Sequence, residues 1–196
     1  MPNPGVYLLV EREYEVKIAV ENLKEIEKAL KEIGAVFEDE VYEEDYYIDL
    51  RPCKDLKASD EALRVRISKG SRTTIESYEF TYKGPKIRPD LKVRDEITIE
   101  VSDGRALIEI FRRLGFRTYI IRKKRKVYRY GKYKVFLDEV MGLGRFVEIE
   151  VEGASNVKEF ASEIRKLVSI LKLTGSFISK SYLEMILDRI EVIERG

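Results

Sequence analysis

The stretch Glu13-Tyr14-Glu15-Val16-Lys17 alternates charged and apolar residues without interruption. In a β-strand successive side chains point to opposite faces, so the three charged residues share one face and the two apolar residues share the other. One such strand is typical of the solvent face of a sheet. Similar alternation recurs around Arg64 and Arg66, Lys83, Arg94 and Glu96, Lys123 and Arg125, and Glu148 and Glu150. So many organised charges indicate that the charged faces meet in a shared interior.

Length and composition favour a globular protein. The 196 residues suit a single domain spanning 1–196, and 44% hydrophobic with 37% charged residues is typical of a soluble fold. The net charge of +1 does not suggest a nucleic-acid partner. No apolar run approaches the roughly 18 residues of a membrane helix, and Met1 to Gly5 lacks the apolar core of a signal peptide. We therefore expect a cytoplasmic protein without a membrane partner, and its wealth of Glu, Lys and Arg leans toward a thermophile.

The sequence contains no histidine and a single cysteine, Cys53. An internal disulfide is excluded, and no neighbouring Cys or His provides a zinc site. Histidine chemistry is excluded as well. Any general base is then a carboxylate, a lysine, a tyrosine or a metal-bound water.

The rest of the chain divides into alternating strands and amphipathic helices. Alternation predicts strands over 36–50, 62–67, 76–83, 96–101, 118–130, 133–140 and 146–151. Apolar residues at helical spacing predict helices after the capping residues Asn22 and Asp103, and further helices over 157–167 and 182–193. The segment from Gly84 to Lys92 is expected to form a mobile, basic loop.

About eight strands with charged faces predict an α+β fold with an unusual interior. If the antiparallel sheet closes into a barrel, the charged set lines a tunnel and the apolar set faces outward, where helices cover it. The candidate tunnel cations are Lys17, Arg64, Arg66, Lys83, Arg94, Lys123 and Arg125, and the candidate tunnel acids are Glu13, Glu15, Glu96, Asp138, Glu148 and Glu150. Seven cations are able to hold several phosphates, and paired carboxylates are able to hold a hard divalent metal.

Several segments, in order along the chain, resemble the CYTH superfamily of triphosphate tunnel metalloenzymes. Glu13-x-Glu15-x-Lys17 is similar to the family's ExExK strand. Further similar segments are 45–49, 60–66, 81–86, Arg94 with Glu96, Lys123-x-Arg125-x-x-Tyr128, 137–140 with 142–144, and 146–150. The last segments, with Ser181-Tyr182-Leu183-Glu184, are most similar to the archaeal type of the class IV adenylyl cyclase-like branch.

The resemblance implies roles for these residues. The seven basic residues would clamp a triphosphate, and Glu13, Glu15, Glu148 and Glu150 would hold one or two Mg²⁺ or Mn²⁺ ions. Glu96 and Asp138 are expected to be structural partners of the tunnel arginines. The expected substrate is ATP, thiamine triphosphate or inorganic tripolyphosphate. A homodimer through the outer face is compatible with the sequence, although no residue pattern indicates one.

Two departures from the branch bear on the reaction. Its characterised bacterial cyclases carry a His-Phe pair just before ExExK, where this chain reads Leu8-Leu9-Val10-Glu11, and Met141 stands where a Glu is usual. Cyclisation demands a positioned nucleoside, whereas hydrolysis demands only a positioned water. We therefore expect hydrolysis of a triphosphate. The alternatives are a cyclase that converts ATP to cyclic AMP and pyrophosphate, and a sensor that binds a polyphosphate or nucleotide without reaction.

Overall fold

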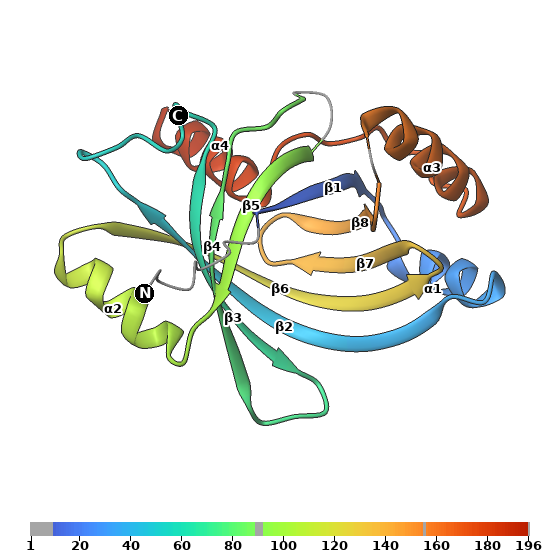
Figure 1. The fold of residues 1–196 in the computed structure, drawn as a ribbon, viewed down its shortest axis with the longest axis horizontal. Coiled ribbons are helices and arrows are strands. Elements are labelled where there is room, and N and C mark those ends of the chain that lie inside the picture. The colour runs from blue at the N-terminus through green and yellow to red at the C-terminus, as the bar shows by residue number, and fades with distance from the viewer. Residues whose placement is uncertain (1–9, 89–91, 155, 196) are drawn as a thin grey trace, which may run out of the picture.

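The computed structural model describes residues 10–88, 92–154 and 156–195, without the side chains of 191–195. Eight strands of this described part form a closed antiparallel barrel in the order β1-β5-β4-β3-β2-β6-β7-β8 (Figure 1). Their bounds are β1 Val10–Ala19, β2 Val36–Asp49, β3 Ala62–Gly70, β4 Glu76–Lys83, β5 Lys92–Glu100, β6 Arg117–Tyr130, β7 Tyr133–Val140 and β8 Gly144–Val151. The predicted α+β barrel is therefore confirmed.

Four helices of the described chain lie outside the ring of strands (Figure 1). They are α1 Leu23–Glu32, α2 Gly104–Arg113, α3 Val157–Ile170 and α4 Tyr182–Arg195. The predicted caps are present: the Asn22 side chain accepts from the backbone N–H of Lys24, and the Asp103 side chain accepts from that of Ala106. Each cap pairs a donor that the first helical turn leaves unbonded, which fixes where the helix begins.

The main hydrophobic core lies between the outer face of the barrel and the helices. Tyr14, Val16 and Ile18 of β1 are buried there with Leu30 of α1 and Phe160 of α3. The Tyr14 and Phe160 rings lie 5.4 Å apart between centroids. The apolar half of the alternating pattern thus points outward, as the sequence predicts, and the charged half is left for the interior.

Strand register sets charged residues side by side in the interior. Glu15 of β1 lies opposite Lys92 on one neighbouring strand and opposite Glu150 on the other. Lys17 lies opposite Glu148 in the same ladder. Cβ atoms of such directly opposed residues lie about 4.5–5.5 Å apart, so long charged side chains reach one another across the strands.

The segment before α4 closes over one end of β1. The backbone N–H of Ile178 donates to the carbonyl of Lys17 at 2.8 Å, and Phe177 forms an isolated bridge with Ile18. The Tyr182 ring packs edge-on against Phe146, with centroids 5.2 Å apart. These contacts hold the first turn of α4 against the barrel.

Three expectations fall wholly or partly outside the described residues: the lack of a signal peptide at 1–5, the departure from the His-Phe pair at 8–9, and residues 89–91 of the expected loop. Lys92, which the sequence assigns to the end of that loop, is instead the first residue of β5. None of the described helices is long and apolar enough to cross a membrane.

Candidate active site

One cavity of about 90 Å³ occupies the interior of the barrel. Its lining includes all seven candidate cations: Lys17, Arg64, Arg66, Lys83, Arg94, Lys123 and Arg125. It also includes the four candidate metal ligands Glu13, Glu15, Glu148 and Glu150, together with Glu96. Asp138 does not line the cavity but lies fully buried behind it. The structure therefore brings together residues contributed by strands that are far apart in the sequence.

Glu43 and Asp45 of β2 form ion pairs with cations on one side of the cavity. The Arg66 guanidinium donates from Nε to Asp45 Oδ1 at 2.6 Å and from Nη2 to Asp45 Oδ2 at 2.9 Å. The Lys123 ammonium lies 2.7 Å from Glu43 and 3.1 Å from Asp45. Burial opposes ionisation of Asp45, but the nearby Arg66, Lys123 and Arg64 charges prevail and hold its pKa well below the usual value. Both acids therefore stay ionised and fix the cations in place.

Asp138 performs the same task for Arg125. The guanidinium donates to both oxygens of Asp138, at 2.7 and 2.6 Å, and also donates to Glu148. The Tyr182 hydroxyl donates to Asp138 Oδ2 at 2.8 Å. Asp138 thus sets the orientation of a cavity cation from outside the cavity, which fits the expected structural partner.

Glu96 pairs with Lys83, and two arginines keep donors available. Lys83 donates to Glu96 and lies 3.6 Å from Glu13. Arg64 donates from Nη2 to the Thr81 hydroxyl at 3.3 Å, while its buried Nε has no hydrogen-bond partner among the described residues. Arg94 is 5% exposed, and among the described residues its nearest carboxylate oxygen, on Asp60, is 3.8 Å away. Both guanidinium groups line the cavity, so an anion there would accept hydrogen bonds from their remaining accessible donors.

Three glutamates form a cluster suited to a divalent cation. One carboxylate oxygen from each of Glu13, Glu15 and Glu150 lies within 4.8 Å of the others. Burial and the neighbouring carboxylates raise the pKa of Glu15 to about 7 and that of Glu150 to about 8. Burial also raises the pKa of Glu13. Closely spaced oxygen ligands that repel one another fit a hard divalent cation, which would remove that repulsion.

Glu148, the fourth candidate ligand, has different surroundings. Its carboxylate lies 3.3 Å from Lys17 and 3.4 Å from Lys92, and it accepts a hydrogen bond from Arg125. Burial opposes its ionisation, but Lys92, Lys17 and Arg125 hold its pKa well below the usual value. Glu148 is therefore neutralised by the protein itself.

The sequence reasoning missed Lys92 and Tyr182 as parts of the site. Both line the cavity. The Lys17 ammonium lies 3.6 Å from the centre of the Tyr182 ring and donates to the Lys180 carbonyl at 3.1 Å. Burial and the Lys92 charge lower the pKa of Lys17 to about 8. Period-two spacing from Arg94 was the available signal for Lys92, since residues two apart share a strand face.

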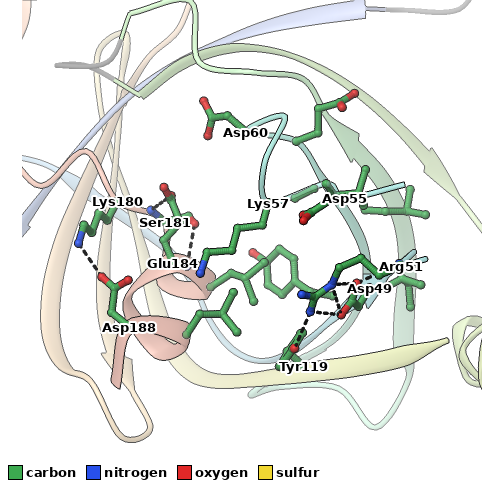
Figure 2. A pocket seen from close by; sticks show the side chains of 18 of the residues that line it. Asp49, Arg51, Asp55, Lys57, Asp60, Tyr119, Lys180, Ser181, Glu184 and Asp188 are labelled. Carbon is green, nitrogen blue, oxygen red and sulfur yellow. Dashed lines mark hydrogen bonds and ion pairs between the residues drawn. The ribbon is translucent and has the colours of Figure 1, made fainter. Parts of the chain in front are cut away.

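A second pocket, of about 220 Å³, adjoins the cavity between the segment 50–61 and α4 (Figure 2). Arg94 and Ser181 belong to the lining of both. Ion pairs border the pocket, with Arg51 Nη2 at 2.5 Å from Asp49 and Lys180 Nζ at 2.5 Å from Asp188. Apolar side chains complete the lining: Ile48, Leu56, Leu63, Leu183 and Leu187. The pocket therefore offers an apolar surface with a charged border next to the cationic cavity.

Solved structures and a curated relative resemble this chain over most of its length. A protein of Methanocaldococcus jannaschii named "Putative adenylate cyclase MJ0240" is 33% identical over 178 residues, which cover 88% of this chain and 97% of that protein. The structure of PH1819 from Pyrococcus horikoshii OT3 is 35% identical, with a TM-score of 0.77 and coverage of 90% and 99%. A Hippeastrum adenylyl cyclase homologue, described as having a dominant triphosphatase activity, shares the fold with a TM-score of 0.65 at 17% identity, with coverage of 87% and 93%.

The family model for the CYTH domain matches residues 11–182. This match begins at β1 and reaches the first residue of α4, so it includes every strand that lines the cavity. The length of the match and the 33% identity to the archaeal relative show that the chain belongs to the CYTH domain family.

Proposed function

We propose that this protein is a divalent-metal-dependent triphosphatase that binds a nucleoside triphosphate or inorganic tripolyphosphate inside the barrel. One observation carries the proposal: buried cations, among them Arg64 with an unbonded Nε, share a cavity with the Glu13, Glu15 and Glu150 cluster. A polyanion with a bound divalent ion has complementary charges to such a cavity. Membership of the CYTH family supports triphosphate chemistry, while the archaeal relative's name, "Putative adenylate cyclase MJ0240", favours the cyclase alternative.

The protein's part in the reaction is positioning and charge neutralisation. Phosphoryl transfer spreads negative charge over the oxygens of the transferred group, and fixed cations in a water-poor site stabilise that charge. Arg64, Arg66, Lys83, Arg94 and Arg125 are held by carboxylates or strand packing, so little reorganisation is required when substrate binds. Lys17 and Lys123 complete the set of cations that would contact phosphate oxygens.

Glu13, Glu15 and Glu150 would hold the metal ion. A divalent ion held there would supply positive charge to offset the negative charge that develops on the phosphate. The glutamates contribute by presenting oxygens from two adjacent strands, β1 and β8, in a fixed geometry. With histidine absent from the sequence, a carboxylate, lysine or tyrosine remains to accept the proton of an attacking water.

The adjoining pocket favours a second candidate, ATP cyclisation. Its apolar lining and its continuity with the cavity near Arg94 would suit the organic part of a nucleoside triphosphate. We place hydrolysis first because cyclisation also needs the ribose hydroxyl aimed at the α-phosphorus, and the His-Phe pair of characterised cyclases is missing.

The deciding experiment incubates the pure protein with ATP, thiamine triphosphate or tripolyphosphate, with Mg²⁺ or Mn²⁺, and separates the products. Orthophosphate release without cyclic AMP supports the proposal, whereas equal amounts of cyclic AMP and pyrophosphate establish the cyclase. Tight binding without turnover establishes a sensor.

Glu150→Gln should lose activity, while Glu152→Gln, a matched change to a side chain that is 52% exposed, should keep it. Equal activity of the two variants would remove Glu150 from the site.

A further inference from the structure

Lys92 places an ammonium group between two of the carboxylates that the family resemblance assigns to metal. Its Nζ donates to Glu15 and lies 3.4 Å from Glu148. The side chain is 10% exposed, and the residue stands opposite Glu15 in the ladder between β1 and β5. The ammonium is therefore a built part of the interior, fixed by strand register and by two ion pairs.

The four glutamates consequently divide into two groups. Glu148 has Lys17, Lys92 and Arg125 within ion-pair distance. Among the described residues, no lysine or arginine lies within ion-pair distance of Glu150, which remains close to Glu13 and Glu15. Glu148 is thus surrounded by cations, whereas Glu13 has Lys83 at 3.6 Å, Glu15 has Lys92, and Glu150 has no such partner in the described part of the chain.

Two-metal sites for phosphoryl chemistry hold their ions about 3.5–4 Å apart. Here Glu15 belongs to the acidic cluster and also contacts Lys92, so it would be the bridging ligand. Lys92 Nζ stands on the side of Glu15 that faces Glu148, where a second ion would sit. A divalent ion at that distance from an ammonium would be repelled strongly in a poorly solvated interior.

We propose that the Lys92 ammonium takes the position of a second divalent ion, so that the barrel binds one metal ion, at Glu13, Glu15 and Glu150. The inference rests on the proposed function, because it assumes that the acidic cluster binds metal. An ammonium brings a single charge and donates hydrogen bonds, whereas a divalent ion would coordinate water. Lys92 would therefore contact a phosphate oxygen directly.

The test is Mn²⁺ binding at equilibrium without substrate, measured from the electron paramagnetic resonance of free Mn²⁺. Wild type should bind one Mn²⁺ per chain. Lys92→Ser removes the charge and leaves room, so it should bind two ions, or bind the first at least about tenfold more tightly. Lys92→Arg keeps the charge and should still bind one. Lys92→Gln, a neutral side chain close to the native length, provides the same tenfold test if Lys92→Ser does not fold.

Two Mn²⁺ ions in wild type would overturn the proposal. So would a folded Lys92→Ser or Lys92→Gln variant that binds one ion with unchanged affinity. These outcomes are distinct from failure of the proposed function. A wild type that binds one ion but cleaves no triphosphate refutes the triphosphatase alone, and one that binds two ions and cleaves refutes the Lys92 proposal alone. A wild type that binds no Mn²⁺ refutes both.

Discussion

The Asp138 carboxylate allows the cost of breaking a buried ion pair in this barrel to be measured. Asp138 is fully buried and accepts two hydrogen bonds from Arg125 and one from Tyr182. In Asp138→Asn the amide keeps the shape but loses the charge, and its NH₂ group faces donors. Removing one partner of a buried pair costs about 3–5 kcal/mol because the other charge is left unpaired. Arg125 retains Glu148, so we expect about 3 kcal/mol.

The assay is urea and thermal unfolding followed by circular dichroism. For a chain of this length 1 kcal/mol lowers Tm by about 2–4 °C, so Asp138→Asn should lower it by roughly 6–12 °C. Asp95→Asn is the matched control, since Asp95 also accepts two hydrogen bonds from an arginine, Arg12, but its side chain is 46% exposed. Solvent screens that pair, so its loss should be less than about a quarter as large. Equal losses from the two variants would refute the reasoning that burial sets the cost.

Other changes follow from the same structure. Burial opposes ionisation of Glu27, but hydrogen bonds from two lysines and a tyrosine prevail and lower its pKa to about 2. Its contribution is therefore complete above the unfolded pKa near 4.5 and is lost as the pH falls through the folded pKa of about 2. Glu27→Gln should cost on the order of 1 kcal/mol at pH 7 and only a small part of that at pH 2, which urea titrations at several pH values will show. Burial raises the pKa of Glu13 and of Glu15, so the double variant Glu13→Gln, Glu15→Gln should keep or raise Tm. The same variant should lose metal-dependent turnover, and a fully active double variant would contradict the ligand assignment. In Gly175→Ala the new Cβ would lie 2.6 Å from Ile18 Cγ2, so the free energy of unfolding should fall by roughly 1–3 kcal/mol. An unchanged urea midpoint would mean that the segment before α4 shifts to accommodate the methyl group without cost.

Alternation carried most of what the sequence could predict. It identified which face of each strand carries charge, because the side-chain period of a strand is two. With seven cations and six acids on such faces, a closed barrel was the arrangement that brought them together, and the structure has it. Helix bounds followed from caps such as Asn22 and Asp103, whose short polar side chains bond the first turn.

Pairing inside the barrel could not be predicted in the same way. Which acid meets which cation depends on the register between strands that are distant in the sequence, and alternation fixes the face but not the register. Glu148 therefore looked equivalent to Glu150 in the sequence, although it is surrounded by cations. Lys92 was assigned to a loop because the Gly84-Pro85 stop precedes it. Nothing in local spacing indicated that the Tyr182 ring would face Lys17.

Closure of the barrel has a consequence for how the chain folds. β1, the first strand, pairs with β8, the last strand, and also with β5. During synthesis β1 cannot form its second strand pairing until β8 has been made, and pairing between strands that are distant in the sequence makes folding slow. Until then the interior charges remain hydrated, so their desolvation is concentrated in the final closing step. We expect that step to be rate-limiting and salt-sensitive, in contrast to the early packing of α1 and α3 against apolar strand faces.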